Sequence, residues 1–300
     1  MAAPTEARLR TIDHGTIPTN DLNALERFYV HLLGLKIDNR PNMTTDFFRK
    51  GIAPGIFAGF GTSELGLFLE SKYDLPPTEG TRGLPRFGLE VASDDFAPAV
   101  EVIKSAGIEV EGPYDEPDPG VLRTVYFRDP AGNYVEVVDR GAIRNPAVAK
   151  FDWRRVDHVE YDTPHFDETV KVWREALGMD VFVSDAGSEG DGRVAFIPFA
   201  ETGQWVRYHE VDEFRPRSSK EWRGIHWAFG ATTADYHELR GRLDAMGIQN
   251  GHYRGDKDHG DLREVTDTYG NAEPGIYFWD ANEKKLEITP KDPPPVYRYP

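Results

Sequence analysis

Short runs of alternating apolar and polar residues recur along the chain and predict a protein built largely from short strands. Residues 124–129 (TVYFRD) and 226–231 (HWAFGA) are two examples. Alternation with a period of two is typical of a strand with one buried face. Between such runs, apolar residues fall at helical spacing, as in 26–34 (ERFYVHLLG) and 235–246 (DYHELRGRLDAM). The pattern predicts short amphipathic helices packed on mixed sheets, and therefore an α+β protein.

The same order of elements occurs twice in the chain. A first segment reads as a strand ending near an Asp-His pair, a turn, a helix, a Leu-Gly break and a new strand. A second reads as a strand, an Asp able to cap, and a helix closed by Gly107 or Gly247. A third reads as a strand, a turn and a strand that carries a Glu. The matched pairs are 12–37 with 156–183, 84–110 with 223–248, and 125–139 with 276–290.

Three matches in one order indicate an internal duplication. We expect two repeated domains, residues 8–142 and 152–290, each made of two βαβββ modules. The two modules of one copy are expected to pair into a curved, partly closed mixed sheet whose concave face binds a small ligand. A short segment, 140–150, links the copies, and the proline-rich tail 291–300 should be extended.

Composition narrows the chemistry. The 300 residues include no cysteine, which excludes disulfides, thiolate metal sites and cysteine nucleophiles, so any metal must be held by His, Asp or Glu. The net charge of −16 argues against nucleic-acid binding. No apolar run reaches the 18 or so residues of a membrane span, and the N-terminus lacks the apolar stretch of a secretory signal. We therefore expect a cytoplasmic protein without a membrane partner.

Three residues at matched places in the repeated pattern are candidate metal ligands. In the second copy these are His158, His226 and Glu287, and all three fall in predicted strands. Two imidazoles and one carboxylate on one side of an ion leave positions open for substrate, an arrangement that suits Fe(II) or Mn(II) and also Zn(II). The alternative for each histidine alone is an ordinary structural role.

The first copy serves as an internal comparison. Its matched residues are His14, Phe87 and Glu136. Because a phenyl ring cannot bind a metal, this copy is expected to hold none. His14 and Glu136 would then be relics of the duplication.

At these residues the chain resembles the vicinal oxygen chelate superfamily, which has the glyoxalase/bleomycin resistance/dioxygenase fold. Within it the chain is similar to two-domain type I extradiol ring-cleaving dioxygenases, most clearly in 127–138 (FRDPAGNYVEVV) and in the segment ending at Glu287. The resemblance implies a C-terminal domain that holds Fe(II), with Mn(II) as the other option, and a metal-free N-terminal domain. It also implies an aromatic diol and O2 as substrates, ring cleavage as the reaction, and a homo-oligomer.

The same resemblance nominates further site residues. Tyr277, ten residues before Glu287, would donate a hydrogen bond or a proton to substrate. The run 254–260 (RGDKDHG) resembles a motif with a second histidine near the metal and nominates His259, with His252 as a competitor. The family's acid–base histidine has no direct match, because Gln204 or Trp205 stands at its position, and His209 is the nearest candidate. The pocket would be lined by Trp205, Trp227 and Arg254.

Other functions fit the same sequence. The fold also supports isomerases, epimerases, lyases and thiol transferases that use a metal only as a Lewis acid. A metal-free binding or resistance protein is a second alternative. A ring-cleaving enzyme for a hydroquinone, an aminophenol or another non-catechol substrate is a third, because the usual acid–base histidine is missing.

Overall fold

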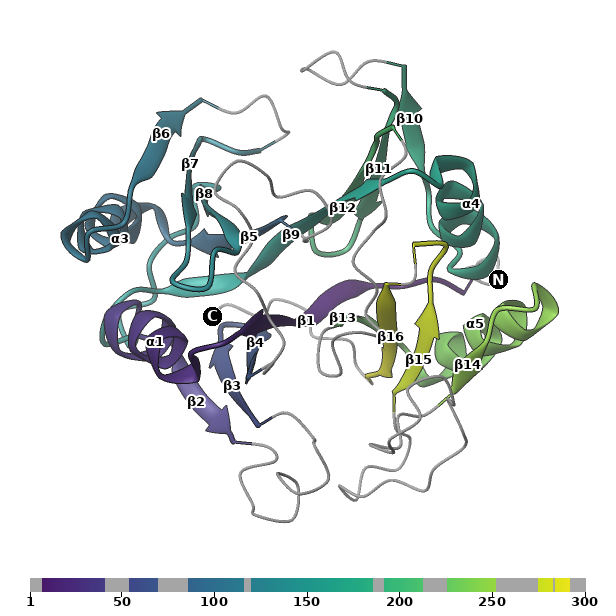
Figure 1. The fold of residues 1–300 in the computed structure, drawn as a ribbon, viewed down its shortest axis with the longest axis horizontal. Helices are drawn as coiled ribbons and strands as arrows, with labels where there is room; N and C mark the ends of the chain where they lie inside the picture. Colours follow the sequence, from purple (N-terminus) through teal and green to yellow (C-terminus); the bar gives the residue numbers. More distant parts are fainter. Residues whose placement is uncertain are drawn as a thin grey trace. The chain divides into compact units, whose positions relative to one another are not determined.

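The computed structural model describes residues 7–40, 54–69, 86–115, 120–185, 192–212, 226–251, 275–282 and 284–291. The chain forms two compact units, one of Met1–Asp13 with Tyr161–Pro300 and one of His14–Glu160. Two strands, β1 (Thr11–Thr19) and β9 (Trp153–Thr163), contain residues of both units (Figure 1). The main chain therefore passes from one unit to the other inside these strands.

The unit His14–Glu160 contains two of the predicted modules. Its first helix continues directly into a π-helical turn, η1. Apart from β1 and β9, its elements in chain order are α1 (Leu22–Glu26), η1 (Arg27–Leu32), β2 (Lys36–Asn39), β3 (Gly55–Phe60), β4 (Ser63–Leu69), β5 (Arg86–Val91), α3 (Ser93–Ser105), β6 (Val110–Tyr114), β7 (Arg123–Arg128) and β8 (Tyr134–Asp139).

The other unit repeats this order, including a π-helical turn at the end of its first helix. Its elements are α4 (Phe166–Lys171), η2 (Val172–Ala176), β10 (Phe182–Ser184), β11 (Val194–Phe199), β12 (Gln204–Glu210), β13 (Trp227–Ala231), α5 (Thr233–Ala245), β14 (Asn250–Gly251), β15 (Ile276–Trp279) and β16 (Lys285–Pro290).

The strands form two eight-stranded sheets. Sheet A has the order β14-β15-β16-β13-β1-β4-β3-β2, and sheet B has the order β10-β11-β12-β9-β5-β8-β7-β6. Both are mixed, since β1 and β4 run parallel, as do β5 and β8, whereas β3 and β4 or β15 and β16 run antiparallel. The predicted α+β class, with repeated modules and mixed sheets, is confirmed.

The strand order differs from expectation in one respect: each sheet takes one module from each copy of the repeat. In sheet B, β9 pairs antiparallel with β5 rather than only with strands of its own copy. The segment 140–150 is held in a turn that allows this. Arg144 donates to the Asp95 carboxylate at 2.9 Å, and the Asn145 N–H donates to Asp152 at 2.7 Å. These hydrogen bonds hold the turn after which β9 lies beside β5.

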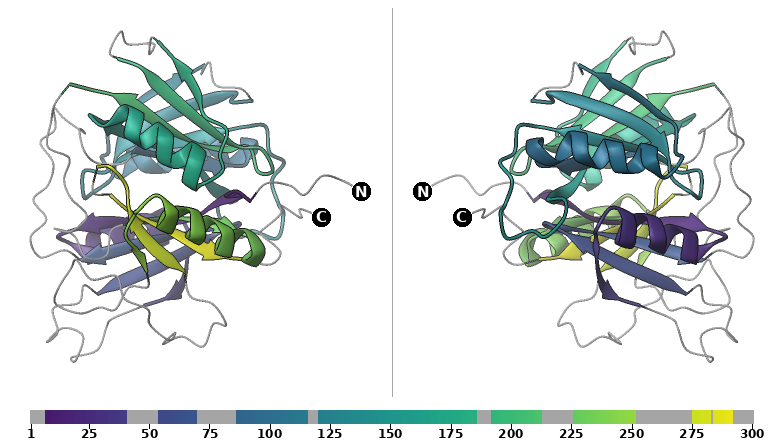
Figure 2. Two further views of the ribbon diagram at one scale, coloured as in Figure 1. Left: turned by 90° about the vertical axis from the view of Figure 1, so that its right-hand side faces the viewer. Right: turned by 90° about the vertical axis from the view of Figure 1, so that its left-hand side faces the viewer.

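Each module buries one face of its strands under a helix. In the unit His14–Glu160, Phe87, Val125 and Val137 are fully buried, and they share a strand face with Arg123, which lies 4.5 Å from the Phe96 ring of α3. Figure 2 shows α3 lying across this part of the sheet. Residues one position along each strand point to the opposite face, because side chains alternate. The ionisable residues of the candidate site lie on that second face.

Glycines end the long helices where expected, but the predicted caps differ. Gly107 and Gly247 have φ of 81° and 70°, the left-handed conformation in which a glycine closes a helix. The expected Asp caps are wrong. Ala92 is the N-cap residue before α3 and provides no side-chain cap, and Thr232 caps α5 by accepting the Asp235 N–H at 3.1 Å. The aspartates lie in the first turns instead, where their negative charge interacts favourably with the positive end of the helix dipole.

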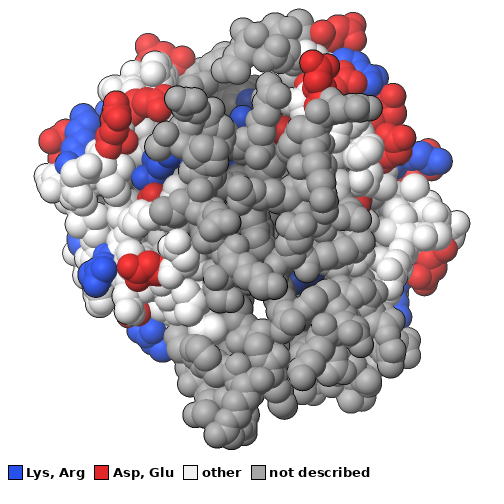
Figure 3. Space-filling view, in the orientation of Figure 1, with Lys and Arg blue, Asp and Glu red and all other residues white. Residues whose placement is uncertain are grey.

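Among the described helices, none has the length and apolar character needed to cross a membrane. On the face drawn in Figure 3, acidic and basic side chains of the described residues lie intermingled.

Candidate metal centre

Strand β1 docks beside β13 through its first residues. The Arg10 N–H donates to the Gly230 carbonyl at 2.8 Å, and the Arg10 guanidinium pairs with Asp235 on α5 at the same distance. Gln204 holds the next residues: its Oε1 accepts the Ile12 N–H at 3.0 Å and its Nε2 donates to the Ile12 carbonyl at 3.1 Å. These hydrogen bonds fix the strand immediately before His14.

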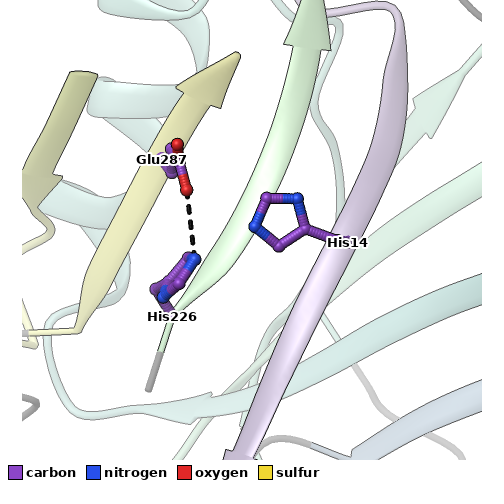
Figure 4. Close-up of side chains that lie close together, drawn as sticks. All are labelled: His14, His226 and Glu287. Atoms are coloured by element: carbon purple, nitrogen blue, oxygen red, sulfur yellow. Dashed lines mark ion pairs between the residues drawn. The ribbon is translucent and has the colours of Figure 1, made fainter. Parts of the chain in front are cut away.

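His14, His226 and Glu287 form a compact group of possible metal ligands. One ligand atom from each lies within 4.8 Å of the others. The Nε2 atom of His226 is 3.0 Å from Oε2 of Glu287. His226 and Glu287 are buried, whereas His14 is half-buried. Figure 4 shows the three side chains turned toward one another from β1, from the residue preceding β13, and from β16.

Strand alternation explains why His226 and Glu287 share a face. In the parallel pair β13–β16, Ala228 is the register partner of Glu287, and His226 lies two residues before Ala228. Trp227 points the other way and is only 2% exposed, on the face where Phe229 meets Trp173 of η2. A Cβ atom on Gly275 would lie 2.1 Å from Oε1 of Glu287, so a larger residue there would displace the carboxylate from this position.

The donor set fits a divalent cation. Two imidazoles and a carboxylate within one small space match the nitrogen and oxygen ligands of Fe(II), Mn(II) and Zn(II). No cysteine competes for the ion. The chemistry of the donors alone does not choose among these metals, because each accepts the same three side chains.

Two residues of β15 and β16 extend the same face. Tyr277 is the register partner of Glu287, and its ring lies 5.3 Å from the His226 ring, edge to face. Lys285, two residues before Glu287, is only 4% exposed, and its ammonium lies 5.5 Å above the Tyr277 ring. The phenol is therefore set between an imidazole and a cation.

On the other side of His14, β4 supplies a carboxylate. Glu64 is the register partner of His14 in the parallel pair β1–β4, so both side chains leave the sheet on one face. Glu64 is exposed. The Phe57 ring on β3 contacts the His14 ring edge-on, with 5.8 Å between centroids.

The structure does not bring His158 to His226 and Glu287. His158 lies on β9 in sheet B, where its Nε2 is 2.9 Å from Glu136 and its Nδ1 is 2.9 Å from Asp157. The structure therefore groups His14, expected to be a relic, with His226 and Glu287 in place of His158. The reason is the strand order, because β1 and not β9 neighbours β13.

Other predicted site residues are placed elsewhere or outside the described part. Trp227 belongs to the helix-facing core. Trp205 and His209 lie on β12 of sheet B, not on the sheet that carries His226 and Glu287. Trp205 there contacts Phe196 and lies under the Arg207 guanidinium at 4.3 Å. His252, Arg254 and His259 lie outside the described residues.

The missed residues differ in the signal that they leave in the sequence. Both copies carry an Asp-His pair at the start, Asp13-His14 and Asp157-His158, so either histidine is available as the third ligand. Glu64 has no such signal, because a glutamate in a predicted strand is an ordinary solvent-facing residue. Only its register with His14 distinguishes it.

Besides the group of possible metal ligands, a cluster of charged side chains lies in sheet B. Its centre is His158, between Glu136 and Asp157, and Arg140 donates to Asp157 at 2.5 and 3.0 Å. Burial opposes the charge on His158, but the carboxylates of Glu136 and Asp157 outweigh it and raise its pKa to about 10. Burial also works against ionisation of Asp157, yet hydrogen bonds from His158 and Arg140 hold its pKa below the ordinary range. This cluster is therefore a network of ion pairs.

Comparison with known proteins supports the fold. Residues 11–137 match the family model described as Glyoxalase/Bleomycin resistance protein/Dioxygenase superfamily. A probable chloroplastic lactoylglutathione lyase from Arabidopsis thaliana is 24% identical over 177 residues. That match covers 57% of this chain and 45% of the plant protein, so the chain spans about half the length of that relative.

Two of the solved structures that match most of the chain illustrate the likeness. A putative dioxygenase from Bacillus subtilis has a TM-score of 0.66 at 16% identity, covering 94% of this chain and 85% of that one. Glyoxalase I from Zea mays has a TM-score of 0.61 at 18% identity, covering 94% of this chain and 92% of that one. At such identities the likeness is one of fold. Together these findings show that residues 11–137 resemble this family and that the chain has the two-domain fold of these glyoxalase and dioxygenase structures.

Proposed function

We propose that this protein is a divalent-metal-dependent enzyme whose metal is held by His14, His226 and Glu287. The supporting observation is the compact group these side chains form, with ligand atoms within 4.8 Å of one another. When bound there, the cation would polarise a substrate oxygen as a Lewis acid. The three ligands leave room for a small substrate that presents two neighbouring oxygen atoms.

Within this class we propose proton transfer, the chemistry of an isomerase or lyase. The observation that carries this choice is Glu64, an exposed carboxylate in register with His14 on the same sheet face. Glu64 is suited to take a proton from the carbon beside a carbonyl and to return it to the neighbouring carbon. Such a reaction yields an isomer and consumes no oxidant. The plant relative named as a lactoylglutathione lyase is consistent with this class.

Tyr277 is proposed to orient the substrate. Its place opposite Glu287 and its contact with the His226 ring put the phenol on the site face. A phenolic O–H can donate to a substrate oxygen as charge develops there, and the Lys285 ammonium above the ring favours that charge.

A second candidate is extradiol cleavage of an aromatic diol. It is favoured by the two-histidine, one-carboxylate donor set, which is also that of oxygen-using non-haem iron enzymes. The substrates would then be a catechol and O2, with Fe(II) or Mn(II) as cofactor. For this reaction Tyr277 keeps its place and Glu64 serves as the base that ionises the diol.

One preparation tests both candidates. The protein is purified without oxygen and its metal content determined, and then two assays are run on the same sample. Oxygen uptake is followed with a panel of catechols, and deuterium incorporation from D2O is followed by NMR with lactoylglutathione and other small α-hydroxycarbonyl compounds. We expect deuterium incorporation without oxygen uptake.

Oxygen uptake with a catechol and no deuterium exchange would overturn the isomerase proposal in favour of ring cleavage. Protein with no bound metal, even after loading with Fe(II), Mn(II) or Zn(II), would overturn both. The Glu64→Gln variant should lose deuterium exchange. Glu101→Gln is the matched control, because Glu101 is exposed on α3.

A further inference from the structure

The register of the two sheets identifies the counterpart of each candidate ligand. In sheet A, Ala228 lies beside Glu287, and in sheet B, Gly88 lies beside Glu136 in the same parallel arrangement. The residue two positions before Ala228 is His226, and the residue two positions before Gly88 is Arg86. Arg86, not Phe87, is therefore the counterpart of His226.

The sequence repeat puts Phe87 at this place, and the structure corrects that alignment by one residue. Phe87 is fully buried and is the register partner of Val135 on the face that packs under α3. A shift of one residue along a strand moves a side chain to the opposite face.

His158 is the counterpart of His14, and it makes very different contacts. It is 2% exposed, and each ring nitrogen lies 2.9 Å from a carboxylate, one of Glu136 and one of Asp157. A ring that donates from both nitrogens is an imidazolium. The other oxygen of Glu136 accepts the Thr124 hydroxyl at 2.5 Å. The positive charge at this place is carried by the protein itself.

Gly88 is what allows the ring to reach Glu136. His158 is the register partner of Gly88, and Glu136 lies on the far side of Gly88 in the next strand. A Cβ atom on Gly88 would lie 2.3 Å from Cε1 of the His158 ring, so the ring lies across the strand only because no side chain is there. In sheet A the same place is held by Ala228, whose methyl group does not leave this space.

Arg86 adds a second fixed charge. Its Nε lies 3.2 Å from the carboxylate of Glu160, on the strand face that also carries Gly88. A guanidinium stays protonated and has no lone pair to offer a metal. It therefore cannot take the part that His226 takes in sheet A.

We propose that the Glu136–His158 cluster of sheet B is a second metal site that has been closed, with Arg86 in place of a ligand and Gly88 admitting the imidazolium in place of the ion. The chain then binds metal in sheet A alone, and these two residues decide it. This inference goes beyond the proposed function, because it concerns the other sheet.

The test restores metal ligands to the sheet B site in a variant that lacks the sheet A ligand His226. Co(II) is the probe, measured by elemental analysis and by its visible absorption spectrum. We expect about one Co(II) per chain for the unmodified protein and close to none for His226→Ala. Adding Arg86→His and Gly88→Ala to His226→Ala should restore about one Co(II) per chain. Gly88→Ala with His226→Ala is the matched control and should bind close to none.

A folded triple variant that binds no Co(II) would overturn the proposal, and so would two equivalents in the unmodified protein. Nitrogen-15 NMR of the His158 ring gives an independent check that needs no variant to fold. Both ring nitrogens should carry protons at pH 8, and a neutral ring would overturn the assignment. If the unmodified protein binds no metal, the proposed function fails, whereas the triple variant and the NMR still test this inference.

Discussion

Tyr277 and Glu287 lie directly opposite each other on the antiparallel strands β15 and β16. Partners in such a pair send their side chains to the same face of the sheet. The phenol is therefore beside the candidate ligand, and its ring lies 5.3 Å from that of His226. Sheet B repeats the relationship, since Tyr126 is the partner of Glu136.

Tyr277→Phe should keep the metal and slow turnover. Loss of one positioned proton donor costs about 100-fold in rate, while the three ligands remain. Metal content and kcat are the measurements. Tyr126→Phe, at the same place in sheet B, is the matched control and should leave kcat unchanged. Loss of metal in Tyr277→Phe would argue that the phenol supports the ligands rather than the substrate.

His14→Ala and His158→Ala should separate the two histidines. The first removes a proposed ligand, so bound metal should fall sharply with little effect on unfolding. The second should keep the metal and lower the free energy of unfolding by about 3 kcal/mol, because buried carboxylates lose their cation. Elemental analysis and urea denaturation measure both. Loss of metal in His158→Ala alone would restore the ligand set expected from the sequence.

Glu64→Gln should strongly slow proton transfer and leave the fold intact. An amide of nearly the same shape cannot act as a base, and the side chain is exposed, so little stability depends on it. We expect a fall of about 100-fold or more in kcat, measured as deuterium exchange. A variant with full activity would rule Glu64 out as the base.

The free energy of unfolding should depend on pH through His158. Its pKa of about 10 in the folded protein lies above the ordinary value of 6.5. The folded state therefore binds this proton more tightly, and the resulting stabilisation is present below pH 6.5 and lost as the pH rises through about 10. The measurement is urea denaturation at intervals from pH 6 to 10.

His158→Gln supplies the comparison, because other groups also titrate near pH 10 in both proteins. The difference in unfolding free energy between the two proteins should shrink across this range. A difference that stays constant with pH would show that His158 is uncharged in the folded state.

Local sequence patterns are sufficient to predict the strands and helices and their duplication. Alternation locates the strands, and Gly107 and Gly247 end their helices with positive φ as expected. The turn–strand pattern before Glu287 and the strand that follows His226 are recognisable for the same reason, because both depend on neighbours in sequence. The strand partners depend on distant residues, and there the expectation is wrong.

Two small differences, one in strand register and one in side-chain size, explain why the site was not fully predicted from the sequence. Aligning His226 with Phe87 instead of Arg86 is an error of one residue, but in a strand it exchanges the core face for the site face. Similarly, Gly88 and Ala228 differ by one methyl group, and the space above Gly88 is filled by the His158 ring. Neither effect is visible in composition or periodicity.

The amino-acid sequence alone determined the repeated α+β modules and, through the absence of cysteine, that any metal must be held by histidine and carboxylate. Only the tertiary structure decided which histidine joins His226 and Glu287. Strand pairing is set by long-range burial and hydrogen bonding between complete elements, and two chemically equivalent Asp-His strands satisfy any local pattern equally well. The docking of β1 through Arg10 and Gln204 beside β13 selected His14.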